Sequence, residues 1–351
     1  MTSPLLASCG QPAPPPAPAE TPTPAPPSGP RLYVTDETGG NVIVIDATSG
    51  EVITKIAVGK RPRGILISTD GKVAYVALSG SPIAGPGVDE SKLPPGDRSA
   101  DGIGVVELAT HKMLKTLPSG QDPEAFALSP DGTKLFVSNE ETSEMTVVDL
   151  TNGTIKARVK VGAEPEGVTV TPDGREVYVT SEEDSAIYAI DVATEKLLAT
   201  IKSPGRPRAV VFTRDGKTAF ATNENGGTVT VIDAVTHKVV KTLKMPAIAG
   251  VQVPPRPMGV ALSADGSQVF VSLGRAGAIA VLDVAARSVL KTIDGVGARP
   301  WGIAVNSDGK TLYTANGSSG DVSFVDLATG KVDKRVATGG SPWGVAVAVA
   351  R

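Results

Sequence analysis

Short runs in which apolar and polar residues alternate follow one another from residue 31 to the C-terminus, and this period of two predicts β-strands. One such run, Gly167-Val168-Thr169-Val170, comes two residues after Pro165. Asp-Gly pairs separate the first run of a repeat from the second. They predict two-residue hairpin turns, because Gly adopts a positive φ without a steric penalty. The pairs are Asp70-Gly71, Asp131-Gly132, Asp173-Gly174, Asp215-Gly216, Asp265-Gly266 and Asp308-Gly309.

The runs form a repeat of about 42 residues with four predicted strands per unit. The second strand carries an aromatic residue at a fixed position, and the third ends in a carboxylate. We expect the aromatic residues to fill contacts between units and the carboxylates to accept hydrogen bonds in turns. The aromatic residues are Tyr33, Tyr75, Phe136, Tyr178, Phe220, Phe270 and Tyr313. The carboxylates are Asp46, Glu107, Asp149, Asp191, Asp233, Asp283 and Asp326.

The two ends of the chain belong to one unit. A proline precedes the first strand of all seven units, but only six units have an Asp-Gly turn. The unmatched first strand is residues 344–349, whereas the chain opens on a second strand at residues 31–35. Joining them closes a ring without an exposed sheet edge. We therefore predict an all-β, seven-bladed β-propeller over residues 31–351, with four antiparallel strands per blade and the C-terminal strand joining the N-terminal blade.

Several second strands resemble the YVTN repeat of bacterial and archaeal β-propellers. Examples are Leu32-Tyr33-Val34-Thr35, Leu135-Phe136-Val137-Ser138-Asn139 and Val177-Tyr178-Val179-Thr180. The resemblance extends over nearly everything after residue 30. It implies the propeller fold and a relation to surface-layer proteins, exported YncE-like binding proteins and more distant lactonase-like and haem d1-like propellers. Binding of single-stranded DNA is implied through the YncE-like members alone.

The residue between each proline and the following Gly or Ala changes from unit to unit, and we expect function at this position. In a propeller these seven residues surround one mouth of the central channel. Both tryptophans of the chain lie there, and the flanking residues predict separate acidic and basic sides. The triplets are Pro62-Arg63-Gly64, Pro123-Glu124-Ala125, Pro165-Glu166-Gly167, Pro207-Arg208-Ala209, Pro257-Met258-Gly259, Pro300-Trp301-Gly302 and Pro342-Trp343-Gly344.

We predict a ligand site at this mouth, and we expect insertions at residues 80–102 and 245–255 to reach the same rim. Arg63 and Arg208 could instead simply pair with Glu124 and Glu166 across neighbouring blades. Glu124 and Glu166 also offer oxygen ligands for Ca²⁺, although no defined loop spacing accompanies them. The tryptophans either plug the channel or stack on a planar or anionic ligand. The predicted ligand-binding residues are Arg63, Glu124, Glu166, Arg208, Met258, Arg299, Trp301 and Trp343.

Catalytic motifs are scarce, and we assign no catalytic residue. His111 and His237 occupy equivalent Thr-His-Lys turns, which we place on the face opposite the mouth as solvated residues. This argues against a haem-ligating histidine and a Ser-His-Asp site at the mouth, and there is no Gly-x-Ser-x-Gly motif. Our leading hypothesis is a non-catalytic, monomeric propeller that binds a small molecule or protein. The alternatives are a lactonase-like hydrolase that uses the acidic side and binding of single-stranded nucleic acid.

The composition bears on location and partners. The 351 residues carry a net charge of −3, which gives no broad basic track for nucleic acid. The single cysteine, Cys9, excludes an internal disulfide. Residues 6–10 resemble a bacterial lipobox, although residues 1–5 lack a basic and apolar leader. We interpret residues 1–9 as a remnant of a lipoprotein signal peptide lipidated at Cys9, and the Pro/Ala-rich residues 10–30 as a disordered tether. The expected location is periplasmic or extracellular, with a lipid anchor.

Overall fold

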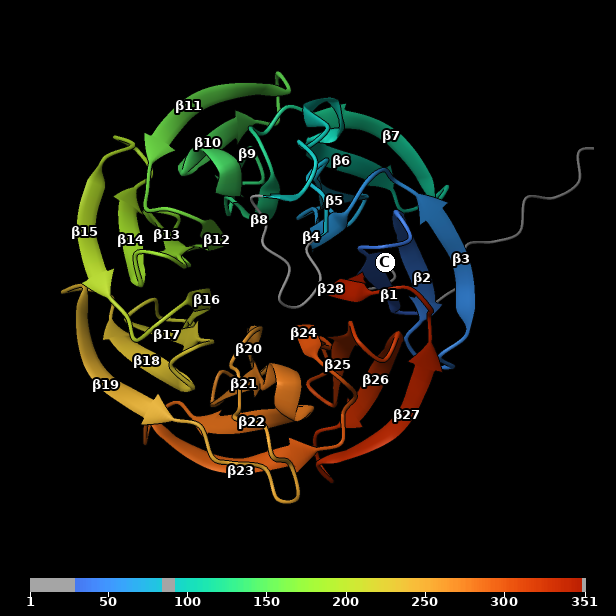
Figure 1. Cartoon of the computed structure of the whole chain (residues 1–351), viewed down its shortest axis with the longest axis vertical. Helices are drawn as coiled ribbons and strands as arrows, with labels where there is room; N and C mark the ends of the chain where they lie inside the picture. The colour runs from blue at the N-terminus through green and yellow to red at the C-terminus, as the bar shows by residue number, and fades with distance from the viewer. Residues whose placement is uncertain (1–28, 84–91, 349–351) are drawn as a thin grey trace, which may run out of the picture.

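Seven four-stranded antiparallel sheets stand as blades around a central channel (Figure 1). This computed structural model describes residues 29–83 and 92–348. The interpreted signal-peptide remnant, Cys9 and nearly all of the tether lie outside the described residues. The sheets confirm the predicted seven-bladed propeller. In the part of the chain that is described, no helix has the length and apolar character needed to span a membrane.

Each blade leads from an inner strand beside the channel to an outer strand on the rim (Figure 1). Blade 1 contains β28 (Pro342–Ala348), β1 (Arg31–Asp36), β2 (Asn41–Asp46) and β3 (Val52–Ala57). Blade 2 contains β4 (Pro62–Ile67), β5 (Val73–Leu78), β6 (Gly102–Glu107) and β7 (Lys112–Leu117). Blade 3 contains β8 (Pro123–Leu128), β9 (Lys134–Asn139), β10 (Glu144–Asp149) and β11 (Thr154–Lys160). Blade 4 contains β12 (Pro165–Val170), β13 (Glu176–Ser181), β14 (Ala186–Asp191) and β15 (Leu197–Lys202).

The remaining blades follow the same plan. Blade 5 contains β16 (Pro207–Phe212), β17 (Thr218–Asn223), β18 (Thr228–Asp233) and β19 (Lys238–Lys244). Blade 6 contains β20 (Val260–Leu262), β21 (Gln268–Ser272), β22 (Ala278–Asp283) and β23 (Ser288–Asp294). Blade 7 contains β24 (Pro300–Val305), β25 (Thr311–Asn316), β26 (Asp321–Asp326) and β27 (Lys331–Ala337). Single 3-10 turns are η2 (Arg98–Ala100), η3 (Glu140–Thr142) and η4 (Gly274–Ala276).

Blade 1 joins the two ends of the described chain. β28 runs antiparallel to β1, and Leu32 lies opposite Val347. Ring closure by the C-terminal strand is therefore confirmed. Because Arg31 lies opposite Ala348, both ends leave from the face opposite the turn before Pro342.

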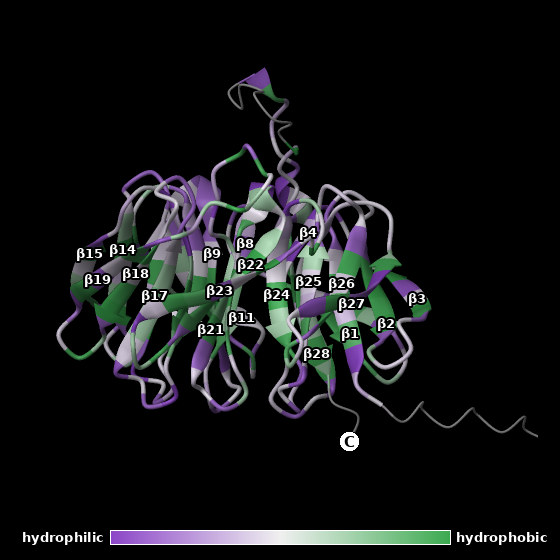
Figure 2. Cartoon of the chain, turned by 90° about the horizontal axis from the view of Figure 1, so that it is seen from below, coloured by the Kyte–Doolittle hydropathy of each residue, from purple (hydrophilic) through white to green (hydrophobic). Residues whose placement is uncertain are grey.

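The apolar core lies between adjacent blades. Figure 2 shows hydrophobic colour along the strands and hydrophilic colour at many of the turns on both faces. Phe220 of β17 packs with Val269 and Val271 of β21. Tyr313 of β25 packs with Leu32 of β1. All seven second-strand aromatic residues are buried, which confirms that they fill contacts between blades.

The Asp-Gly pairs lie in longer turns than the two-residue hairpins that the sequence predicts. The N–H of Ser68 donates to the carbonyl of Val73 at 2.9 Å, so that residues 69–72 form the loop. Gly71 has φ of 70°. The Asp70 carboxylate accepts hydrogen bonds from the Ser68 hydroxyl (2.7 Å) and the Lys72 N–H (3.1 Å). This side-chain cap stabilises a wider turn than a two-residue hairpin requires.

The carboxylates at the ends of the third strands also behave as predicted. Asp46 Oδ1 accepts hydrogen bonds from the N–H groups of Thr48 (2.9 Å) and Ser49 (2.7 Å). Asp233 accepts from the N–H groups of Val235 and Thr236 in the same way. These side chains therefore stabilise the turn that follows each third strand.

The inner strands touch one another closely around the channel, which explains the Gly or Ala after each variable residue. A Cβ on Gly167 would lie 2.1 Å from the carbonyl oxygen of Arg208 in the next blade. A hydroxyl from the second strand also links neighbouring blades: Thr222 donates to the Met258 carbonyl at 2.6 Å. The same link is made by Thr35, Ser138, Thr180 and Ser272.

The insertion at residues 245–255 reaches the rim, as predicted, but does not line the mouth. It lies against the turn between β17 and β18, where the Met245 N–H donates to the Gly227 carbonyl at 3.0 Å and a Cβ on Gly227 would lie 3.5 Å from the Pro255 carbonyl oxygen. Met245 and Ile248 are buried in the apolar core between blades 5 and 6, and no residue of this insertion lines the two cavities at the channel mouth. Burial of these apolar side chains holds the insertion in place. The Met and Pro residues of its sequence did not indicate this burial. Described residues of the insertion at 80–102, including Ser81, Ile83 and Arg98, do line the outer cavity.

Candidate functional site

The seven variable residues form a layer across the channel, which we name the mouth ring: Arg63, Glu124, Glu166, Arg208, Met258, Trp301 and Trp343. A cavity of about 730 Å³ lies on the side of the proline turns. A smaller cavity of about 240 Å³ lies further along the inner strands, beside Val168, Val210, Val260 and Ile303. Five members of the ring line both cavities: Glu124, Glu166, Arg208, Trp301 and Trp343.

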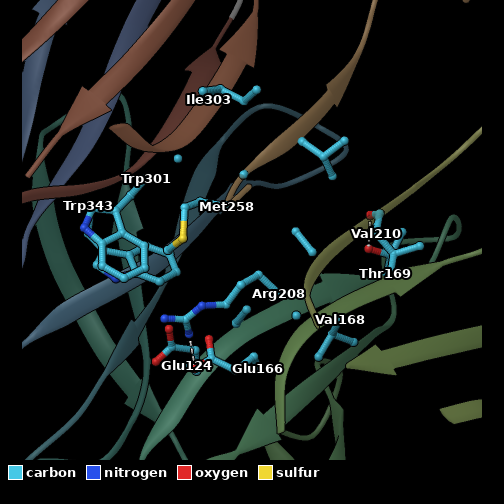
Figure 3. A pocket seen from close by; sticks show the side chains of 16 residues that line it. Glu124, Glu166, Val168, Thr169, Arg208, Val210, Met258, Trp301, Ile303 and Trp343 are labelled. Atoms are coloured by element: carbon cyan, nitrogen blue, oxygen red, sulfur yellow. Dashed lines mark hydrogen bonds and ion pairs between the residues drawn. The ribbon is translucent and has the colours of Figure 1, made fainter. Parts of the chain in front are cut away.

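All eight residues predicted from the sequence line one or both cavities. Met258 lines the inner cavity, whereas Arg63 and Arg299 line the outer cavity. Figure 3 shows the Arg208 guanidinium between the indole pair and the carboxyl groups of Glu124 and Glu166. Residues from six inner strands therefore meet at one place, although their role as a ligand site stays a prediction.

The residue before the proline adopts a left-handed backbone conformation in several blades. Asp122, Glu164 and Arg206 have φ of 55°, 48° and 58°, which is uncommon for residues other than Gly. In each case the carbonyl accepts the N–H of a glutamate at the end of the neighbouring second strand. One such bond joins Glu224 N to Arg206 O at 2.9 Å. This hydrogen bond brings a third side chain from each of these blades to the rim.

Those third side chains are functional candidates that the sequence analysis did not assign to the ligand site. Glu140, Glu182 and Glu224 lie four residues after the second-strand aromatic residue. Their fixed spacing from Phe136, Tyr178 and Phe220 is the signal that could have placed them at the mouth.

Arg63 is the centre of a buried ion cluster between blades 2 and 3. Its side chain is 1% exposed, and it contacts Asp122 at 2.6 Å and Glu140 at 3.0 Å. It also forms an ion pair with Glu124 and donates to the carbonyl of Pro123. The interpretation that Arg63 pairs with Glu124 across neighbouring blades is therefore confirmed.

Arg208 has the same role between blades 4 and 5. It forms ion pairs with Glu166 and Glu182, and its Nε lies 3.0 Å from Glu224. Arg206 also contacts Glu182. This cluster confirms the predicted pairing of Arg208 with Glu166.

The buried carboxyl groups outnumber the arginines that neutralise them, and the pKa values of several of them are raised. Burial raises the pKa of Glu124 to about 8, against the attraction of Arg63 and with the repulsion of Glu166. Burial likewise raises the pKa of Glu166 well above its usual range. A carboxyl group with a pKa of about 8, as Glu124 has, can donate or accept a proton near neutral pH.

The carboxylates are a poor site for calcium. One oxygen each of Glu124, Glu140 and Glu166 lies within 4.8 Å of the others. However, Arg63 contacts two of these groups and Arg208 contacts the third. The guanidinium groups already supply the positive charge, and calcium requires six to eight oxygen ligands.

The opposite side of the mouth has an aromatic surface. Trp301 and Trp343 stack with ring centroids 5.9 Å apart and an angle of 19° between their planes. The Arg299 guanidinium lies 4.5 Å and that of Arg208 5.2 Å from the Trp301 ring centre. Gly317 makes room for this arrangement, since a Cβ there would lie 3.0 Å from Trp301. Both tryptophans are half-buried, which differs from fully enclosed channel plugs.

The histidines contact residues of a neighbouring blade away from the mouth. His111 Nε2 lies 3.2 Å from Arg31, and His237 Nε2 lies 2.9 Å from Glu176. Both are partly buried rather than fully solvated as expected. Neither lines a cavity at the mouth.

Comparison with known families shows to which family of propellers the chain belongs. Residues 168–349, just over half of the chain, match the family described as "Lactonase, 7-bladed beta-propeller". The chain belongs to this lactonase propeller family. Residues 33–206 also match a family described as a choice-of-anchor I domain.

Individual relatives of this lactonase propeller are distant. The uncharacterized protein YncE of Salmonella typhimurium is 27% identical over 116 residues, which cover 33% of this chain and 27% of that protein. The chain is thus matched over about a quarter of the length of this curated relative. The resemblance to YncE and to lactonase-like propellers is confirmed, although the match is short.

Two solved structures share the fold. The periplasmic gluconolactonase PpgL of Pseudomonas aeruginosa is 20% identical, with a TM-score of 0.73 over 92% of this chain and 99% of that chain. Hydrazine synthase of Kuenenia stuttgartiensis is 22% identical, with a TM-score of 0.66 over 81% and 88% of the two chains. Because these two proteins have different activities on similar propellers, the shared fold does not by itself assign a function.

Proposed function

We propose that the protein binds a small molecule at the mouth ring. The observation that carries this proposal is the half-buried pair of Trp301 and Trp343 beside the 730 Å³ cavity, with Arg299 stacked on Trp301. The buried ion clusters of Arg63 and Arg208 stabilise the blades, but partly exposed indoles at a cavity have no such structural need. Concave sites with aromatic walls and a few polar groups are typical of small-molecule binding.

Lactone hydrolysis is the second candidate, and two observations favour it. The chain belongs to a lactonase family, and Glu124 and Glu166 line the cavities beside Arg208. In such a reaction a carboxylate removes a proton from water as the water attacks the lactone carbonyl. A guanidinium stabilises the oxyanion, and a protonated carboxyl gives its proton to the leaving ring oxygen. The raised pKa of Glu124 suits the carboxyl group that gives its proton to the leaving ring oxygen.

The proposal includes export of the protein. The structural relative PpgL is described as periplasmic, and a lipid anchor at Cys9 would place this chain at a membrane surface. Both described ends of the chain lie on the face opposite the mouth, so an anchored propeller would present the mouth away from the membrane.

We do not extend the proposal to nucleic acid, because the carboxylates at the mouth would repel phosphates.

The experiment uses D-gluconolactone and gluconate as probes, measuring binding by calorimetry and hydrolysis by acid release. We expect at least one probe to bind, and we expect Trp301→Ala/Trp343→Ala to abolish binding while the thermal unfolding midpoint changes little. Unfolding of this double variant, or unchanged binding by it, would contradict the binding proposal.

The same experiment separates the two candidates. Acid release above the buffer rate that falls at least about tenfold in Glu166→Gln would establish hydrolysis. Binding of gluconolactone without such turnover would leave a non-catalytic binding site.

A further inference from the structure

Among the described arginines that line the outer cavity, Arg299 alone has no carboxylate partner. Arg206, Arg208 and Arg256 all lie within 4 Å of a carboxylate. Among the described residues, no carboxylate forms an ion pair with Arg299, and its guanidinium instead lies over the Trp301 ring. Partial burial, with Arg208 and Arg275 nearby, holds the pKa of Arg299 below its usual range despite the attraction of Glu224. An anion bound at Arg299 would restore the lost solvation.

Aromatic and apolar side chains lie beside this cation. Trp301 and Trp343 are nearly parallel, and the Met258 side chain lies beside them (Figure 3). Trp301, Trp343 and Arg299 all line the outer cavity. A flat ring can contact such a surface over its whole face, whereas a saturated ring contacts it through fewer atoms.

We infer that the ligand of the mouth is a planar ring compound that carries a carboxylate, with the carboxylate at Arg299 and the ring against the indole pair. This inference rests on the proposed small-molecule site and names the class of its ligand. A singly charged carboxylate suits Arg299 better than a phosphate does. A phosphate would bring nearly twice the charge toward the other carboxylates that line the outer cavity, which include Asp122, Glu141 and Glu164.

The test uses benzoate, benzyl alcohol, cyclohexanecarboxylate and phenyl phosphate as probes. Trp301 and Trp343 are the two tryptophans of the chain, so tryptophan fluorescence reports on this site alone, and calorimetry gives the affinities. We expect benzoate to bind at least about tenfold more tightly than each of the other three. Arg299→Gln should remove the preference for benzoate over benzyl alcohol, and Arg299→Lys should keep part of it.

Arg214→Gln is the matched control, because Arg214 is exposed beside the Asp215-Gly216 turn on the opposite face. It removes the same charge and should leave every affinity unchanged. Equal binding of benzoate and benzyl alcohol, tighter binding of phenyl phosphate, or an unchanged benzoate affinity in Arg299→Gln would overturn the inference. If benzoate fails but gluconate binds with a change in tryptophan fluorescence, the ligand class is wrong while the proposed site stands. If no probe binds, both fail.

Discussion

The arginines at the mouth have two kinds of surroundings. Arg63 and Arg208 are buried among carboxylates from neighbouring blades. Arg299 is half-buried against an indole. In the first case the charges cancel within the protein and connect blades. In the second case the compensating charge has to come from solvent or a ligand, which is why we place recognition at Arg299.

The raised pKa of Glu124 predicts a specific pH dependence of stability. Between its usual 4.5 and about 8, the folded protein holds a proton that the unfolded chain releases. The free energy of unfolding should therefore fall as the pH rises from about 5 to about 8. Urea unfolding across this range measures the slope. Glu124→Gln, which mimics the protonated group, should make the slope shallower, whereas exposed Glu51→Gln should not. A stability that rises over this range would refute the assignment.

Neighbouring blades are held at a fixed spacing by contacts between their inner strands. The Thr222 hydroxyl donates to the Met258 carbonyl and accepts a hydrogen bond from the Ala209 N–H at 3.1 Å. One side chain thus satisfies two backbone groups from two blades. The variable residue keeps its backbone in this contact while its side chain is free to change, so the mouth ring varies without loss of the fold.

This spacing predicts the effect of adding a methyl group at the inner strand. Gly167→Ala should destabilise the protein by about 1–3 kcal/mol, because its Cβ would meet the Arg208 carbonyl at 2.1 Å. Gly302→Ala is the matched comparison, with a distance of 2.7 Å to the Trp343 carbonyl, and its effect should be smaller. Chemical denaturation of both variants provides the measurement. A neutral Gly167→Ala would show that the blades can separate without cost.

The whole ring depends on one strand that joins its ends. β28 supplies the inner strand of blade 1, and Val345 packs in the cluster shared with blade 7. Without β28, the strand β1 would present an unpaired edge, and the core around Leu32 and Val34 would be exposed.

Deletion of residues 342–351 should therefore abolish cooperative thermal unfolding and cause aggregation, as measured by circular dichroism and size-exclusion chromatography. A chain that lacks only residues 349–351 is the control, and it should unfold like the intact protein. A monomeric, cooperatively unfolding chain without β28 would show that six blades and an incomplete seventh are sufficient.

The fold could be predicted from the sequence, because each signal acts locally and recurs from blade to blade. An aromatic residue such as Phe220 predicts a second strand in all seven units, and a pair such as Asp173-Gly174 predicts a turn in each of the six units that contain it. Counting prolines against Asp-Gly turns was enough to predict ring closure. The eight mouth residues were also predictable, since a repeat places equivalent positions at equivalent points of a ring.

Which of these residues neutralise one another depends on how the blades are placed in space. Arg208 meets Glu166 from the preceding blade and Glu224 from its own, while Arg299, at the position equivalent to Arg206, meets an indole. Burial of Met245 and Ile248 likewise keeps the insertion at residues 245–255 out of the cavity walls. Ion pairing and burial depend on distances across blades and on access to solvent, and neither is encoded in any single repeat.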